Sequence, residues 1–122
     1  MLKSYRELQV WQRSIQLATS VYRFTAGFPR DEVYGLSSQM KRAAVSVASN
    51  IAEGYGRLSV GEYRQFLGIA RGSALELQTQ FEIARRLGIG EDGVLTETEA
   101  LSEQVSKMLY AMIDKLKGTR AN

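Results

Sequence analysis

Residues 35–56, GLSSQMKRAAVSVASNIAEGYG, carry the clearest structural pattern in the chain. Apolar side chains recur along one helical face at steps of three or four residues. Small and ionic groups form a second row beside them. The apolar row consists of Leu36, Met40, Ala43, Val47 and Ile51, and the second row of Arg42, Ser46, Ser49 and Glu53. The pattern predicts a helix that packs on an apolar core and allows polar groups to approach closely.

Similar spacing elsewhere predicts four helices in all, over residues 5–25, 33–55, 59–87 and 96–117. Three starts are indicated by a Ser or Thr followed three residues later by Glu, because these side chains satisfy free amides of the first turn. These pairs are Ser4–Glu7, Ser59–Glu62 and Thr96–Glu99. Leu58 and Tyr63 are spaced to pack across the second cap.

The first helix has two apolar rows, of which one suffices to join a four-helix core. The second row either meets another subunit or lies deeper in the same one. One row has heptad spacing and consists of Leu8, Trp11, Ile15, Ala18, Tyr22 and Thr25. The other row consists of Val10, Leu17, Val21 and Phe24.

No segment shows strand alternation, so we expect an all-α fold, an up-down-up-down four-helix bundle forming one domain over residues 1–122. Residues 88–93, GIGEDG, match the pattern G-x-G-x-x-G. A dinucleotide-binding loop needs a preceding strand, whereas a helix precedes this one. The stretch is therefore interpreted as a helix cap followed by a loop.

Composition argues against catalysis. The chain has no His and no Cys, which removes the commonest general base, the thiolate nucleophile and the usual transition-metal ligands. We expect no enzymatic activity, no metal and no cofactor. The N-terminal stretch lacks a secretory signal, and no apolar run approaches the roughly 18 residues of a membrane span. A cytoplasmic location is expected, without membrane association.

Antiparallel packing of the second and third helices about Leu58 pairs polar residues between them. This register places Arg42 opposite Glu76, Glu53 opposite Arg64, and Ser46 opposite Gly72. Gly68 and Gly72 each destabilise a helix by about 1 kcal/mol relative to Ala. Their presence inside the third helix therefore predicts that another helix packs closely against it there. The seam either fixes helix register or binds a ligand directly. It comprises Arg42, Ser46, Asn50, Glu53, Gly72, Ser73 and Glu76.

The net charge of +3 is unevenly distributed. Residues 1–90 carry 12 basic against 7 acidic side chains, whereas residues 91–122 carry 4 against 6. A basic body permits contact with nucleic-acid phosphates, although each cation could equally belong to a solvated helix face. The candidate contacts are Arg6, Arg13, Arg23, Lys41, Arg57, Arg64, Arg71, Arg85 and Arg86.

Several stretches resemble a known family. They are LQVW at residues 8–11, FP at 28–29, YGLSSQMKRAAVSVASNIAEGYGR at 34–57 and EYRQFLGIARGSALELQTQ at 62–80. The chain resembles the four-helix-bundle proteins encoded in intervening sequences of 23S ribosomal RNA genes. That family is related to the accessory variability proteins of diversity-generating retroelements. Ala48 departs from the family pattern, which often has Pro there, and this predicts a straighter helix.

The resemblance implies a ring-like homopentamer without known enzymatic activity. Its retroelement relatives bind nucleic acid and a reverse transcriptase through a basic surface. Our first hypothesis is an oligomeric protein that binds RNA or DNA or serves as an adaptor, with a reverse transcriptase or a ribosomal RNA-associated protein as partner. The alternative is a protein–protein scaffold whose basic charge is incidental.

Overall fold

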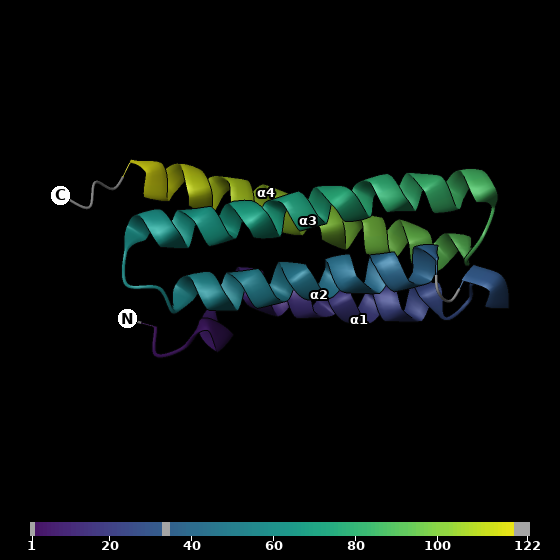
Figure 1. Ribbon diagram of the computed structural model, residues 1–122, viewed down its shortest axis with the longest axis horizontal. Helices are drawn as coiled ribbons and strands as arrows, with labels where there is room; N and C mark the ends of the chain where they lie inside the picture. Colours follow the sequence, from purple (N-terminus) through teal and green to yellow (C-terminus); the bar gives the residue numbers. More distant parts are fainter. Residues whose placement is uncertain (1, 33–34, 119–122) are drawn as a thin grey trace.

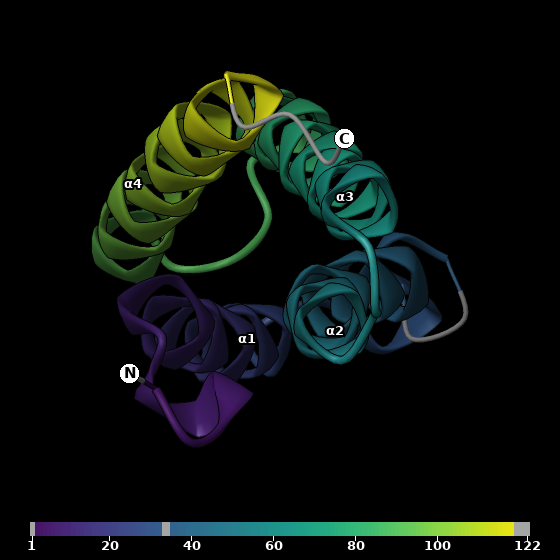
Figure 2. The same cartoon turned by 90° about the vertical axis from the view of Figure 1, so that its left-hand side faces the viewer.

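The computed structural model describes residues 2–32 and 35–118. Four helices run antiparallel: α1 (Gln9–Thr25), α2 (Leu36–Tyr55), α3 (Val60–Leu87) and α4 (Asp92–Lys117) (Figure 1). Two short 3-10 helices, η1 (Tyr5–Glu7) and η2 (Arg30–Glu32), precede α1 and α2. Viewed end-on, the four helices follow chain order around the axis, and α4 returns to α1 (Figure 2). Since these ranges contain no strand, the prediction of an all-α fold of four helices is confirmed.

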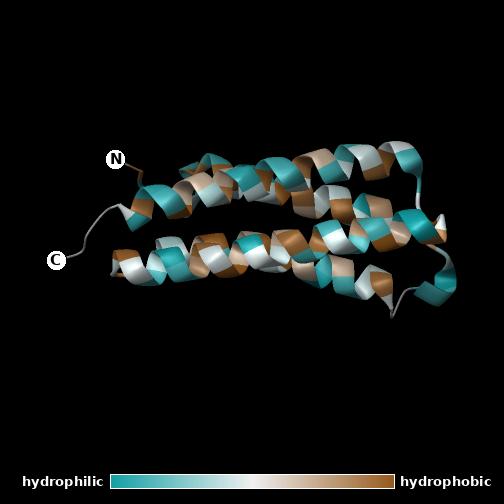
Figure 3. Cartoon of the chain, turned by 90° about the horizontal axis from the view of Figure 1, so that it is seen from above, coloured by the Kyte–Doolittle hydropathy of each residue, from teal (hydrophilic) through white to brown (hydrophobic). Residues whose placement is uncertain are grey.

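Each helix buries one apolar face in a common core. Hydrophobic and hydrophilic segments alternate along every helix (Figure 3). Full burial of a Leu or Phe side chain stabilises a fold by about 1.5–3 kcal/mol, so these residues dominate the stability. The largest fully buried side chains are Phe24, Phe81, Leu17, Met40, Ile51, Leu67, Leu77 and Leu109.

The two apolar rows on α1 lie at different depths. Val10, Leu17, Val21 and Phe24 are buried, whereas Ile15 and Tyr22 of the heptad row are 37% and 49% exposed. The other members of the heptad row are buried or pack half-buried against the core, namely Leu8, Trp11, Ala18 and Thr25. The heptad row therefore lies at the edge of the core and is only partly exposed. The start predicted at Tyr5 is also wrong, because the chain becomes extended at Leu8 and α1 begins at Gln9. The Ser4 hydroxyl caps η1 instead, accepting a hydrogen bond from the Arg6 amide at 3.1 Å.

The start of α3 is as predicted. The Ser59 hydroxyl accepts a hydrogen bond from the Glu62 amide at 3.1 Å. The predicted packing of Leu58 on Tyr63 is wrong, because Leu58 is fully exposed. For α2, described residues place the start at Leu36, and residues 33–34 of the predicted first turn lie outside the described ranges.

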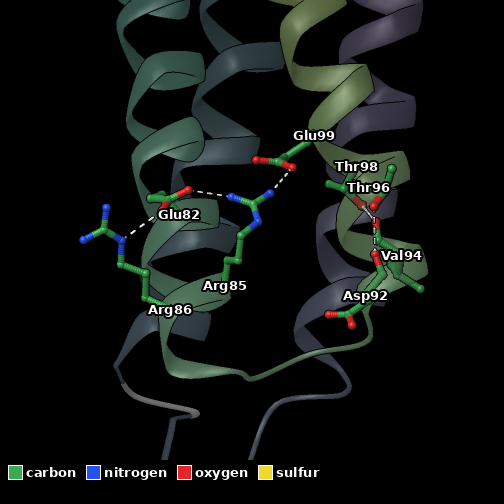
Figure 4. Close-up of polar contacts among 8 residues, drawn as sticks. All are labelled: Glu82, Arg85, Arg86, Asp92, Val94, Thr96, Thr98 and Glu99. Carbon is green, nitrogen blue, oxygen red and sulfur yellow. Dashed lines mark hydrogen bonds and ion pairs between the residues drawn. The ribbon is translucent and has the colours of Figure 1, made fainter.

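The connection between α3 and α4 is shorter than expected. Gly88 ends α3 as predicted, with a left-handed φ of +68°, and the Ile89 amide donates to the Ala84 carbonyl. The helix α4 then starts at Asp92, so the start predicted at Thr96 is wrong. The Thr96 hydroxyl lies inside the helix and donates to the Asp92 carbonyl at 3.1 Å (Figure 4).

Two glycines allow close packing, but neither is one that the sequence indicated. A Cβ at Gly54 would lie 2.8 Å from the Phe66 Cβ, so α2 and α3 meet closely there. Gly90, with a φ of +83°, packs directly against the Phe24 ring. A Cβ at Gly68 or Gly72 would meet nothing within 4 Å, so the prediction that these two residues enable close packing is wrong.

Candidate nucleic-acid interface

Four of the nine candidate cations form ion pairs with a carboxylate, and five do not. Arg23 on α1 pairs with Glu97 on α4 at 3.2 Å. Arg57, which directly follows α2, pairs with Glu53 at 3.5 Å. This second pair replaces the predicted contact between Glu53 and Arg64. Both arginines are therefore balanced by a neighbouring carboxylate and are poorer phosphate ligands than the sequence indicated.

The other two paired cations, Arg85 and Arg86, lie at the end of α3, where an ion pair also reaches α4 (Figure 4). Arg85 donates to Glu82 at 2.6 Å and also pairs with Glu99 of α4, while Arg86 donates to Glu82 at 2.9 Å. Hydrogen bonds from Arg86 and then Arg85 lower the pKa of Glu82. The hydrogen bond to Glu99 raises the pKa of Arg85. Two carboxylates thus neutralise two of the candidate cations.

The other five candidates form no ion pair with any described residue. Three of them lie over aromatic rings: the Lys41 Nζ is 5.2 Å from the centre of the Tyr22 ring, the Arg6 guanidinium lies over Tyr5 and Trp11, and Arg71 lies over Tyr110. Such contacts do not neutralise the positive charge, so the cation can still bind an anion. The five are Arg6, Arg13, Lys41, Arg64 and Arg71.

Arg64 and Arg71 lie seven residues apart on the same side of α3, about 10 Å along its axis. The Nε atom of each is buried and has no hydrogen-bond partner among the described residues. Buried donors are almost always bonded, so these two side chains have unused hydrogen-bonding capacity. The Arg71 guanidinium also lies 5.3 Å from the centre of the Tyr110 ring on α4.

A cavity of about 290 Å³ opens between α3 and α4 at this point. Its lining consists of Arg71, Ser106, Lys107 and Tyr110, with no carboxylate. Within residues 2–32 and 35–118, Lys107 forms no ion pair and the Ser106 hydroxyl forms no hydrogen bond. We call Arg64, Arg71 and Lys107 the α3/α4 basic strip.

Sequence reasoning missed the α4 side of this cavity. Lys107, which lies in a segment with net negative charge, is not among the nine candidate cations. The available signal was the antiparallel register of α3 and α4, which brings Arg71 to Tyr110 and Arg85 to Glu99. That register depends on the short connection after Gly88, where the sequence predicted a later helix start.

The structure brings only part of the predicted polar seam together. The Ser46 and Ser73 hydroxyls lie 2.9 Å apart, and the Asn50 amide donates to the Ser46 hydroxyl and carbonyl at 3.0 and 2.8 Å. These three residues link α2 to α3. The remaining members are exposed and lie outside this group, in contrast to the prediction: Arg42, Glu53, Gly72 and Glu76.

The predicted pairing of Arg42 with Glu76 is also wrong. Arg42 donates to the Ser38 hydroxyl at 3.3 Å within α2, and Glu76 accepts from the Gln80 amide at 3.3 Å within α3. The cause is the register, because Ser46 faces Ser73 rather than Gly72. A shift of one helical residue turns the neighbouring side chains by about 100°.

A second hollow lies outside the core, between α1 and α2. Its volume is about 300 Å³, and its exposed lining is largely apolar. Val45, on its α2 side, is 47% exposed. Trp11, Ile15 and Ala18 of the heptad row on α1 line this hollow, which we call the α1/α2 groove. Its lining is Tyr5, Trp11, Ile15, Ala18, Val45, Ala48, Ser49 and Ala52.

Within residues 2–32 and 35–118, no three acidic side chains gather as metal ligands would, and no helix is long and apolar enough to cross a bilayer. The pKa of Tyr63 is raised by burial and by the nearby Tyr55, which makes its hydroxyl a weaker acid than usual.

Comparisons with known proteins agree with this helical fold. The family described as 23S rRNA-intervening sequence protein matches residues 6–111. A crystal structure of a protein of unknown function from the S23 ribosomal protein family of Bacteroides thetaiotaomicron is similar, with a TM-score of 0.76 and 22% identity. The match covers 85% of this chain and 97% of that one. No curated protein matches.

Proposed function

Because the chain belongs to the family of 23S rRNA-intervening sequence proteins, we propose that it acts by binding rather than by catalysis, as an oligomeric bundle that contacts the phosphate backbone of RNA or DNA. The observation that supports this function is the α3/α4 basic strip, whose three cations have no acidic partner among the described residues. Contacts of this kind bind phosphates without reading sequence. An association with ribosomal RNA also favours a cytoplasmic location.

The salt dependence of binding tests this function. Binding of labelled RNA and DNA oligonucleotides is measured by fluorescence anisotropy over a salt series. We expect log K to fall linearly with log salt, with a slope of about 0.7–0.9 for each phosphate contact. No binding at low salt would reject the proposal.

Charge-matched variants locate the binding surface. Replacing Arg64, Arg71 and Lys107 together by Gln should reduce the slope by about two to three. The control replaces Arg23, Arg57 and Arg86, each of which is already paired with a carboxylate. It removes the same charge and should leave most of the slope intact. Equal losses in both variants would mean that net charge alone drives binding.

A second candidate function is a protein–protein scaffold, which the α1/α2 groove favours. Trp11, Ile15 and Ala18 of α1 line this groove and are only partly covered by the subunit itself, so another protein surface would cover them. We propose that a second copy of the chain occupies this groove and that the assembly is the pentameric ring that the family resemblance implies. A reverse transcriptase or a ribosomal RNA-associated protein remains the proposed further partner.

A further inference from the structure

We infer that the cavity between α3 and α4 holds one unpaired nucleotide, with its base stacked on Tyr110 and its phosphate between Arg71 and Lys107. This inference deepens the proposed function and rests on it. It adds a preference for single strands, which a plain basic surface does not have. The argument has three parts: the ring, the anion ligands and the size of the cavity.

Tyr110 supplies the stacking surface. Its side chain is 59% exposed, although it projects from a helix whose other face is buried in the core. The Arg71 guanidinium lies over this ring, 5.3 Å from its centre, and so places a cation next to an exposed aromatic side chain. Proteins that bind single strands combine these two groups, because every base has a face that stacks on an aromatic ring.

Arg71, Lys107 and Ser106 supply the anion ligands. The Arg71 side chain lines the cavity and carries one positive charge, and Lys107 adds a second. Ser106 adds a hydroxyl with no partner among the described residues. Since the lining contains no carboxylate, no protein group in the lining competes with a bound phosphate. Charge-assisted bonds of Arg to phosphate are among the stronger hydrogen bonds in proteins.

The size of the cavity favours one nucleotide over a base pair. A volume of about 290 Å³ is at the lower end of the range for small-ligand sites. In a duplex the faces of the bases are covered by their neighbours, so the Tyr110 ring would have no free face to contact. An acidic peptide would satisfy Arg71 and Lys107 but would make no use of the exposed ring.

Binding of a single strand and of its duplex tests the inference. We expect the wild-type protein to bind an unstructured oligonucleotide more tightly than the matched duplex in anisotropy titrations. Tyr110→Leu should weaken single-strand binding about tenfold and leave duplex binding unchanged, because only the stacked base is lost. Because Tyr110 is exposed, the variant should keep its fold, and circular dichroism checks this.

Tyr22→Leu is the matched control. Tyr22 is also exposed, at 49%, and also has a cation beside its ring, the Lys41 Nζ at 5.2 Å. It lies on α1, away from the α3/α4 cavity, so this change should leave single-strand affinity unaltered. Equal effects of the two substitutions would overturn the proposed site.

Cross-linking provides a readout independent of affinity. An oligonucleotide that contains 5-iodouracil, irradiated in the complex, should attach to Tyr110. Trypsin cleavage after Lys107 and Lys115 isolates residues 108–115, in which mass spectrometry would find the adduct. Equal binding of single strand and duplex, with no effect of Tyr110→Leu, would overturn this inference while the backbone-binding function stands.

Absence of binding to both nucleic acids would reject the proposed function as well. Displacement of the bound oligonucleotide by an acidic peptide at equal concentration would also overturn the inference, since it would show that charge alone occupies the site.

Discussion

Gly90 shows how a single residue anchors a connection. It adopts a φ of +83°, which side chains disfavour, and a Cβ at this position would overlap the Phe24 ring. We expect Gly90→Ala to lower the free energy of unfolding by about 2–5 kcal/mol, the sum of a left-handed backbone penalty and overpacking. Urea denaturation would measure the change.

Gly88→Ala is the control for this prediction. Gly88 has a similar φ of +68°, but a Cβ there would meet nothing within 4 Å. Only the backbone penalty applies, about 1–2 kcal/mol. If the two variants lose equal stability, the contact between the loop and Phe24 contributes nothing.

At the scale of elements, the cluster of Glu82, Arg85 and Arg86 makes the stability of the fold depend on pH. Its arginine partners lower the pKa of Glu82 in the folded protein. Ionised Glu82 therefore stabilises the fold above the pKa of an unfolded Glu, about 4.3, and this contribution is lost as the pH falls through the lower folded pKa. We expect the melting temperature to fall more steeply between about pH 6 and pH 3 in the wild type than in Glu82→Gln.

The difference should be small, because these side chains are exposed and solvent screens the ion pairs. Glu103→Gln on α4 is the control, since Glu103 forms no ion pair with a described residue. Its acid profile should follow that of the wild type. A Glu82→Gln profile that also follows the wild type would contradict a stabilising role for this cluster.

The elements were more predictable than the contacts between them. Helical periodicity found all four helices, and the Ser59 cap and the Gly88 end were found because both signals are local. The start of α4 was missed because Thr96 mimics a cap while bonding to Asp92 inside the helix. Local sequence patterns therefore predicted which segments are helical better than they predicted where each helix begins.

The candidate site was less predictable for the same reason. Ion pairing depends on rotation of one helix against the next, and a register different by one residue put Ser73 rather than Gly72 opposite Ser46. Periodicity also gave no sign of which α1 row lies deeper in the core. Arg64 and Arg71 were found from their own spacing, whereas Lys107 and Tyr110 become visible only when α4 lies beside α3.

At the scale of the whole molecule, the α1/α2 groove predicts self-association. We expect light scattering to give about 68 kDa, five times the 13.6 kDa subunit, as the family resemblance implies. Val45→Glu should reduce this mass, because it places a charge in the apolar groove. Val45 is 47% exposed in the subunit, so the fold itself should tolerate the change.

Ile83→Glu is the control for assembly. Ile83 is an apolar residue on α3 with a similar exposure, 44%, but it does not line the groove. This variant should keep the mass of the wild type. A wild-type protein of 13.6 kDa at micromolar concentration would contradict self-association.

The open surroundings of Gly68 and Gly72 have a consequence for protein engineering. Each glycine makes the chain more flexible before folding, yet the folded subunit makes no use of the missing side chain. Replacing both by Ala should raise the melting temperature, by about 0.4–1 kcal/mol of unfolding free energy per site. Calorimetry would measure this gain. No gain in the isolated subunit would mean that the helix bends there in a way that Ala does not permit. The exposed face of α3 thus offers a direct route to a thermostable variant.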